Sequence, residues 1–199
     1  RVNGVSKLHG IASRALLKPF WPGLLEEEVP IGSVTNGIHL PTWTSHEITE
    51  AEGGDAKTLW AARRSLKRRL IEKATVSLSR SFLRRNDSPV TLHRMLEGLD
   101  EDALFIGFAR RFAPYKLAHL LFQDIKRLKK ILADEKRPVR ILIAGKAHPR
   151  DQRGKDILRT VAEHARSEDL IGQVFFLEDY DMGVARTLVQ GVDVWLNTP

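Results

Sequence analysis

The residues best suited to chemistry lie in one short stretch, FIGFARRFAPYK, from Phe105 to Lys116. Its apolar beginning is typical of a buried strand. It ends in Arg110 and Arg111, and Tyr115 and Lys116 follow across a proline-containing turn. Three fixed cations at one end of a strand are costly unless an anion shares the site. Because ligands of open α/β sheets bind beyond the carboxyl ends of the strands, position and chemistry together predict a phosphate site.

An alternation of strands and helices must position this stretch. Short apolar runs predict four strands, at residues 104–109, 139–144, 174–177 and 192–196. Helical patterns lie between them, at residues 117–132, 156–165 and 184–190. This alternation predicts an α/β fold built on a parallel, Rossmann-like sheet. Residues 57–85 form a longer helical pattern before the sheet, with Leu59, Ala62, Leu66, Leu70 and Ala74 on one face.

Polar residues follow each predicted strand, and in a parallel sheet they meet at one edge. Gly145, Lys146 and His148 follow the second predicted strand. Glu178, Asp179, Tyr180 and Asp181 follow the third, and Asn197 and Thr198 follow the fourth. The pair Glu178 and Asp179 suits either a general acid or base or a scaffolding role. The sequence has no GxGxxG turn and no GxxxxGK[ST] loop, so side-chain cations and helix N-termini are expected to hold phosphate.

Composition excludes several functions. The chain of 199 residues has no cysteine, which excludes disulfides and thiolate metal sites, and its seven histidines show no metal-ligand spacing, so no metal site is expected. No apolar run approaches the roughly 20 residues of a membrane-spanning helix and no secretory signal is present, so we expect a cytoplasmic protein without a membrane partner.

Much of the net charge of +7 lies in residues 63–69, RRSLKRR. We expect a solvated helix face there and no nucleic acid, since interleaved aromatic residues are absent.

The first forty residues mix loops with short elements. Residues 5–20 predict an amphipathic helix with Leu8, Ile11, Ala12 and Leu16 on one side, and a short strand is expected at Ile31. The chain begins without methionine and stops at Pro199 just after an apolar run. We therefore expect a fragment of a longer protein.

Motifs along the whole chain resemble those of one family. They are VNGVSKLHG (residues 2–10), TNGIHLPTW (35–43), FARRFAPYK (108–116), IAGKAHP (143–149) and FLEDYDM (176–182). In order and spacing these segments resemble the α-glucan phosphorylases, the pyridoxal-phosphate-dependent enzymes of glycogen and maltodextrin breakdown. The details are similar to the divergent bacterial or archaeal branch.

This resemblance implies a glycosyltransferase-B type fold with the active site in a cleft between two domains. Residues 1–36 would be the end of the N-terminal domain, and residues 37–199 the first part of the C-terminal Rossmann-like domain. The enzyme would cleave terminal glucose from an α-1,4-glucan with inorganic phosphate, giving glucose 1-phosphate, and the full-length protein could form a homo-oligomer. The family's Schiff-base lysine would follow Pro199, so the isolated fragment is expected to be inactive.

The resemblance also implies roles for five residues. Arg111 and Lys116 would hold the substrate phosphate, and Asn36 would contact the sugar. Arg110 and Lys116 would lie near the 5′-phosphate of pyridoxal phosphate, and Tyr180 would lie beside the cofactor ring. Two positions depart from the family pattern, Leu117 and Asp181, and no cofactor contact is expected from them.

Two alternatives remain at this point. One is a nucleotide-sugar-dependent glycosyltransferase of the same fold, which would also place cations near a diphosphate. The other is a polyanion-binding α/β module that uses the basic helix at residues 63–69.

Overall fold

The computed structural model describes residues 2–198 and divides the chain into two compact units, with the boundary after Leu40. The expected boundary of the two domains, between residues 36 and 37, stays a prediction, because the units do not by themselves say to which domains of a longer protein they belong. Each unit is described by itself.

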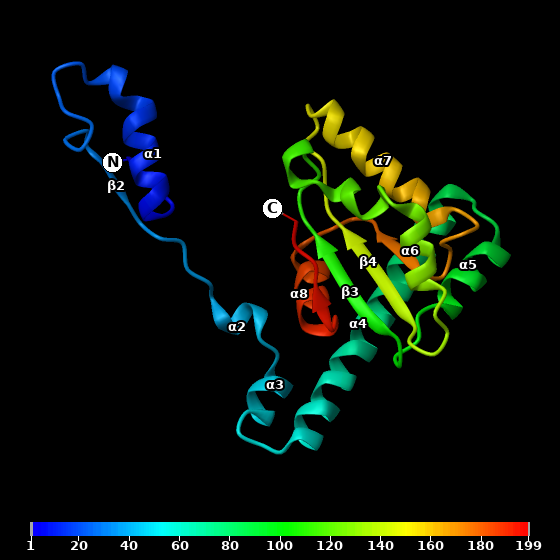
Figure 1. The fold of residues 1–199 in the computed structure, drawn as a ribbon. Coiled ribbons are helices and arrows are strands. Elements are labelled where there is room, and N and C mark those ends of the chain that lie inside the picture. Colours follow the sequence, from blue (N-terminus) through cyan, green and yellow to red (C-terminus); the bar gives the residue numbers. More distant parts are fainter. Residues whose placement is uncertain (1, 199) are drawn as a thin grey trace. The chain divides into compact units, whose positions relative to one another are not determined.

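The smaller unit pairs two short strands beside one helix. Its elements are β1 (Val2–Gly4), α1 (Lys7–Leu17; Figure 1), a 3-10 turn (Lys18–Phe20) and β2 (Ile31–Ser33). The strands β1 and β2 are parallel. The helix begins at Ser6, whose hydroxyl accepts the His9 amide at 3.1 Å.

The expected helix is present, but within this unit its apolar residues Leu8 and Leu16 are 75% and 76% exposed. The buried residue of α1 is Gly10. A Cβ at Gly10 would lie 2.9 Å from the Cβ of Ser33, so the absence of a side chain is what allows the helix to approach β2 so closely.

The larger unit carries the expected alternation. Its elements after α2 (Leu40–Trp43) are α3 (His46–Ala51), α4 (Ala56–Arg85), α5 (Pro89–Glu97), β3 (Leu104–Ala109), 3-10 turns η2 (Pro114–Lys116) and η3 (Ala118–Phe122), α6 (Ile125–Leu132), β4 (Val139–Ala144), α7 (Gln152–Arg166), β5 (Val174–Leu177), α8 (Met182–Gly191) and β6 (Val194–Trp195). The first three strands of the sheet have the predicted bounds, and the fourth is shorter than predicted.

The strands of this unit form a parallel sheet with the order β5-β4-β3-β6 (Figure 1). Ile106 at the centre of β3 lies opposite Ile141 of β4 on one side and Val194 of β6 on the other. The predicted α/β fold with a parallel sheet is confirmed.

Helices cover both faces of the sheet because its buried strands are apolar on both sides. On one face, Phe105, Leu142 and Phe175 belong to a cluster with residues of α4, α5 and α8. On the other face, Phe108 and Ile143 belong to a second cluster with residues of η3, α6 and α7. The result is three layers with the sheet in the middle.

The single helix expected at residues 117–132 is wrong. Leu117 has a left-handed backbone (φ 52°), which ends η2, and the chain then makes the 3-10 turn η3. Helix α6 starts anew at Asp124, whose carboxylate accepts the Arg127 amide at 3.0 Å. The helical pattern is therefore divided by a residue that departs from helical geometry and by a second helix cap.

Candidate phosphate site

The strand order identifies where a ligand is expected. Counted along the chain, the strands lie in the order third, second, first, fourth, so the direction of winding reverses between β3 and β6. In doubly wound sheets the ligand crevice lies beyond the carboxyl ends of the strands at this reversal. The loop after β3, residues 110–116, begins at that point. The fold therefore places the cation-rich stretch where a Rossmann-like sheet binds its ligand.

The backbone of this loop is held against the loop that follows β4. The Arg110 amide donates to the Ala144 carbonyl at 3.3 Å, and the Phe112 amide donates to the Lys146 carbonyl at 2.9 Å. Gly145 lies between these two contacts with φ 152°, and a Cβ there would lie 2.0 Å from the Arg110 carbonyl oxygen. Close approach of two backbones thus requires glycine at this position.

The three cations of the loop have different surroundings. Arg110 donates through Nη1 to the carbonyl of Thr198, just beyond β6. Arg111 is exposed and donates through Nη2 to the Tyr115 hydroxyl at 2.8 Å. The Lys116 ammonium lies 4.8 Å from the centre of the Tyr115 ring. Arg111 and Lys116 are thus brought together around one phenol, which is the convergence that an anion site needs.

Tyr115 links these groups electrostatically. The hydrogen bond from Arg111 lowers the pKa of its phenol, and the positive charges of Arg111, Lys116 and Arg110 act in the same direction. The same field favours any anion that enters the loop. Sequence reasoning named Tyr115 as part of the stretch but gave it no role.

The other predicted site residues fall in two places. Tyr180 follows β5, packs against the buried cluster beside α4 and α8, and burial raises the pKa of its phenol. Asn36 lies in the smaller unit, where its backbone N–H donates to the Val5 carbonyl at 3.0 Å. The roles of all five residues in binding stay predictions.

The acidic residues after β5 have scaffolding contacts. Glu178 forms ion pairs with Arg84, Arg85 and Arg166, and Asp179 pairs with Arg84 at 2.7 Å. These contacts tie the loop to the end of α4 and to α7. Of the two roles that the sequence left open, the structure supports the scaffolding role.

Asp181 begins α8. Its carboxylate accepts the Val184 amide at 2.7 Å, and this hydrogen bond lowers the pKa of Asp181 below its ordinary value of 3.8.

We expect Asp181→Ala to lower the free energy of unfolding by about 1 kcal/mol at neutral pH, because the helix loses its cap. A lowered pKa in the folded state stabilises the protein above the ordinary carboxyl pKa and ceases to do so as pH falls through the lowered value. The difference between wild type and Asp181→Ala should therefore shrink below about pH 4. Urea denaturation at several pH values measures it. Asp181→Asn, which keeps the capping oxygen, is the control, and a loss in that variant equal to that of Asp181→Ala would contradict the capping role.

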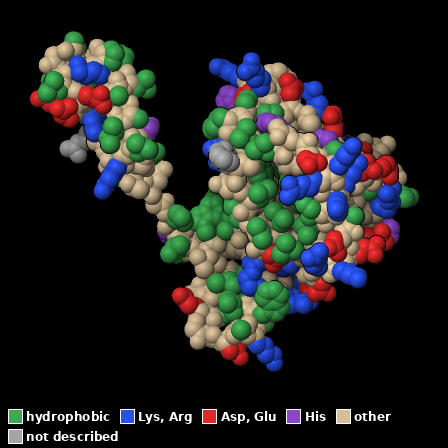
Figure 2. Space-filling model, in the orientation of Figure 1, with side chains coloured by type: hydrophobic (Ala, Val, Ile, Leu, Met, Phe, Trp, Pro, Cys, Tyr) green, Lys and Arg blue, Asp and Glu red, His purple; other side chains and the backbone are tan. Residues whose placement is uncertain are grey.

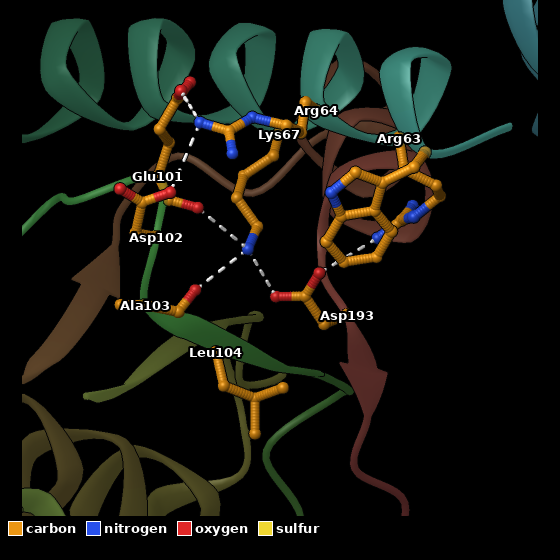
Figure 3. A pocket seen from close by; sticks show the side chains of 9 residues that line it. Arg63, Arg64, Lys67, Glu101, Asp102, Ala103, Leu104 and Asp193 are labelled. Atoms are coloured by element: carbon orange, nitrogen blue, oxygen red, sulfur yellow. Dashed lines mark hydrogen bonds and ion pairs between the residues drawn. The ribbon is translucent and has the colours of Figure 1, made fainter. Parts of the chain in front are cut away.

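The basic stretch at residues 63–69 is not simply a solvated helix face. Lys67 is buried; its ammonium donates to the Ala103 carbonyl at 2.8 Å and lies 2.6 Å from a carboxylate oxygen of Asp193 (Figure 3). Arg63 donates to the same carboxylate at 3.3 Å and to the Val192 carbonyl at 2.6 Å. The carboxylate oxygen of Asp193 that Lys67 contacts, Oδ2, also accepts the Phe105 amide at 2.7 Å. These groups fasten α4 to the first residues of β3 and β6.

A hollow of about 360 Å³ lies beside this cluster, between α4 and the amino-terminal ends of β3 and β6. Its basic lining residues, Arg63, Arg64 and Lys67, face the carboxylates of Glu101, Asp102 and Asp193 (Figure 3). Because these charges already compensate one another, the cluster is suited to holding the fold together. The sequence carried a signal for it, since Lys67 lies three residues before Leu70 and seven before Ala74, on the buried face of the helix.

The remaining cations of the stretch are also paired. Arg68 lies 3.7 Å from Glu101, and Arg69 forms an ion pair with Glu47 of α3. Figure 2 shows Lys and Arg side chains mixed with Asp and Glu on the visible face of the larger unit. A nucleic-acid surface needs cations free to meet phosphates, and each cation of residues 63–69 lies within 4 Å of a carboxylate.

Between residues 2 and 198, no helix is long and apolar enough to cross a membrane. The same residues contain no cluster of three metal-ligating side chains.

The fold and the strand-end cations define the class of the larger unit, a Rossmann-like α/β sheet with cations at the carboxyl ends of its strands. Comparison with curated proteins confirms the resemblance to α-glucan phosphorylases. Over its whole length this chain is 40% identical to the maltodextrin phosphorylase of Thermococcus litoralis. It is 38% identical to the glycogen phosphorylase of Mycobacterium tuberculosis and 40% identical to that of Aquifex aeolicus. The chain spans 26%, 25% and 31% of these three relatives. No protein-family model matches the chain.

Proposed function

We propose that this chain is a segment of an α-1,4-glucan phosphorylase and that the loop after β3 binds the inorganic phosphate substrate. The main support for this proposal is that Arg111 and Lys116 both contact Tyr115. This contact lies where the strand order of the sheet reverses, and the chain is 40% identical to a maltodextrin phosphorylase. Phosphate would attack C1 of the terminal glucose, the bond from C1 to the bridging oxygen would break, and that oxygen would take up a proton. The products are glucose 1-phosphate and a glucan shorter by one residue.

Arg111 and Lys116 suit different parts of this task. Arginine binds phosphate in a bidentate manner, and its hydrogen bond to Tyr115 holds the guanidinium in one direction. Lysine contributes a compact charge on a flexible stem. Both would stabilise charge that develops as phosphate attacks, which is the kind of electrostatic contribution that preorganised donors make.

The residues present also suit pyridoxal 5′-phosphate. Arg110 and Lys116 would hold its phosphate, and the half-buried ring of Tyr180 would lie against its aromatic ring. In this proposal the bound cofactor supplies a phosphate group that takes part in proton transfer. Asn36 would contact the sugar, and the whole enzyme would be a cytoplasmic glycosyltransferase acting on glucan and phosphate, with a possible homo-oligomeric assembly.

The two alternatives have less support. The curated relatives reported above are named phosphorylases rather than nucleotide-sugar transferases. The basic helix that a polyanion-binding module would use has its cations in ion pairs with Asp193, Glu101 and Glu47.

The test is phosphorolysis by the whole enzyme that contains this segment, carrying Arg111→Ala. We expect kcat/KM for phosphate to fall by about 10²- to 10³-fold, because a donor aimed at the reacting anion is lost. Arg111→Lys should recover part of the loss, since it restores charge without the bidentate contact.

Arg159→Ala is the matched control, because it removes an arginine that is 65% exposed on α7 and lies 3.5 Å from Asp156 of the same helix. It should leave kcat/KM unchanged. Wild-type kcat/KM for phosphate in Arg111→Ala would overturn the assignment of this loop.

A further inference from the structure

Thr198, just beyond β6, contacts both ends of the candidate phosphate loop. Its carbonyl accepts a hydrogen bond from Arg110 at the start of the loop. Its hydroxyl donates at 2.5 Å to the carbonyl of Lys116 at the end of the loop. One residue thus joins the cations on either side of Tyr115 across the reversal point between β3 and β6.

The position of Thr198 is itself well determined by the sheet. The Asp193 amide donates to the Phe105 carbonyl at 2.9 Å and the Leu196 amide to the Gly107 carbonyl at 2.8 Å, so the chain follows β3 to within two residues of Thr198. Thr198, which anchors the loop, therefore lies two residues beyond the last of these backbone hydrogen bonds to β3.

The loop contains a strained backbone position next to the carbonyl that Thr198 contacts. Lys116 ends the three-residue turn η2, and Leu117 follows it in a left-handed conformation with φ 52°. A bulky non-glycine residue in that conformation is strained and persists only where its surroundings hold it. The hydroxyl of Thr198 holds the peptide group between Lys116 and Leu117, and so directs the lysine side chain.

We infer that Thr198 is a positioning residue for phosphate binding, acting through Lys116. This inference rests on the proposed function, since it takes Arg111 and Lys116 as the phosphate ligands. In this inference Thr198 does not itself contact phosphate. Its hydroxyl holds the backbone carbonyl of Lys116, and the Lys116 side chain contacts phosphate.

The test compares Thr198→Val and Thr198→Ser in the whole enzyme. Valine removes the hydroxyl but keeps the shape and the carbonyl that Arg110 uses, whereas serine keeps the hydroxyl. We expect Thr198→Val to raise KM for phosphate roughly tenfold, because the Lys116 carbonyl loses its partner, while KM for glucan stays the same. Thr198→Ser should restore KM for phosphate to near the wild-type value.

Thr160→Val is the matched control. It removes a hydroxyl that donates to the Asp156 carbonyl at 3.1 Å within α7, away from the loop. A second comparison adds Lys116→Ala. If Thr198 acts through Lys116, adding Thr198→Val to Lys116→Ala should cause no further loss.

Hydrogen exchange of the amides at residues 110–117 provides a readout that does not need activity. Faster exchange in Thr198→Val than in Thr198→Ser is expected, and equal exchange would overturn the inference whatever the enzyme does. If Arg111→Ala raises KM for phosphate but Thr198→Val does not, the positioning role is wrong and the proposed function stands. If neither changes KM for phosphate, the proposed function itself fails.

Discussion

Replacing Asp193 with alanine is expected to lower the free energy of unfolding of the larger unit by about 3 kcal/mol, because it leaves the charge of Lys67 buried without its carboxylate. The side chain of Lys67 is 10% exposed and that of Asp193 is 18% exposed, so water cannot replace the lost partner fully. The variant also removes the acceptor of the Phe105 amide at the start of the central strand. Urea denaturation of the chain measures the loss, and hydrogen exchange at residues 103–109 locates it.

Asp102→Ala is the control for this prediction. Asp102 belongs to the same charged group and lies 3.2 Å from Arg64, but its side chain is 72% exposed. An exposed pair of this kind contributes about 0–1 kcal/mol. Equal losses in Asp193→Ala and Asp102→Ala would show that the Lys67 cluster does not fasten the sheet.

Replacing Gly145 with alanine is expected to cost at least about 3 kcal/mol, because backbone strain and a collision add together. The φ of 152° is one that residues with a Cβ rarely adopt, and the new Cβ would lie 2.0 Å from the carbonyl oxygen of Arg110. The backbone of the phosphate loop would have to move away from β4. Urea denaturation measures the cost, and phosphorolysis by the whole enzyme should fall with it.

Gly32→Ala provides the comparison for a glycine without such a neighbour. A Cβ at Gly32 in β2 would meet no atom within 4 Å, and its φ lies outside the left-handed range. Its stability should stay within about 0.5 kcal/mol of wild type. A Gly145→Ala variant as stable as Gly32→Ala would mean that the two loops do not need their close approach.

Apolar patterning was enough to predict the sheet of the larger unit. Residues 174–177 are apolar and buried throughout, and residues 139–144 are apolar except for Arg140 near their start, so the strand bounds can be read directly. The location of the candidate site was predictable for the same reason: Arg110, Arg111 and Lys116 follow the end of such a run.

The bounds and packing of helices were less predictable where a single residue departs from the helical or apolar pattern around it. The helical pattern at 117–132 contains Leu117, whose left-handed backbone follows the Lys116 carbonyl that Thr198 contacts. Apolar spacing predicted the helix α1, but it gave no signal for Gly10, the residue of that helix that is buried against β2.

By itself, the sequence determined that this protein contains a parallel α/β sheet and that a cationic stretch follows one of its strands, because burial and charge are properties of residue types and their spacing. The tertiary structure decided which distant groups meet. It brought Asp193 to Lys67, paired the cations of residues 63–69 with acids, and placed Thr198 between Arg110 and Lys116. Such contacts join residues as far apart in sequence as 67 and 193, so they depend on the order of the strands, which a list of residues along the chain does not contain.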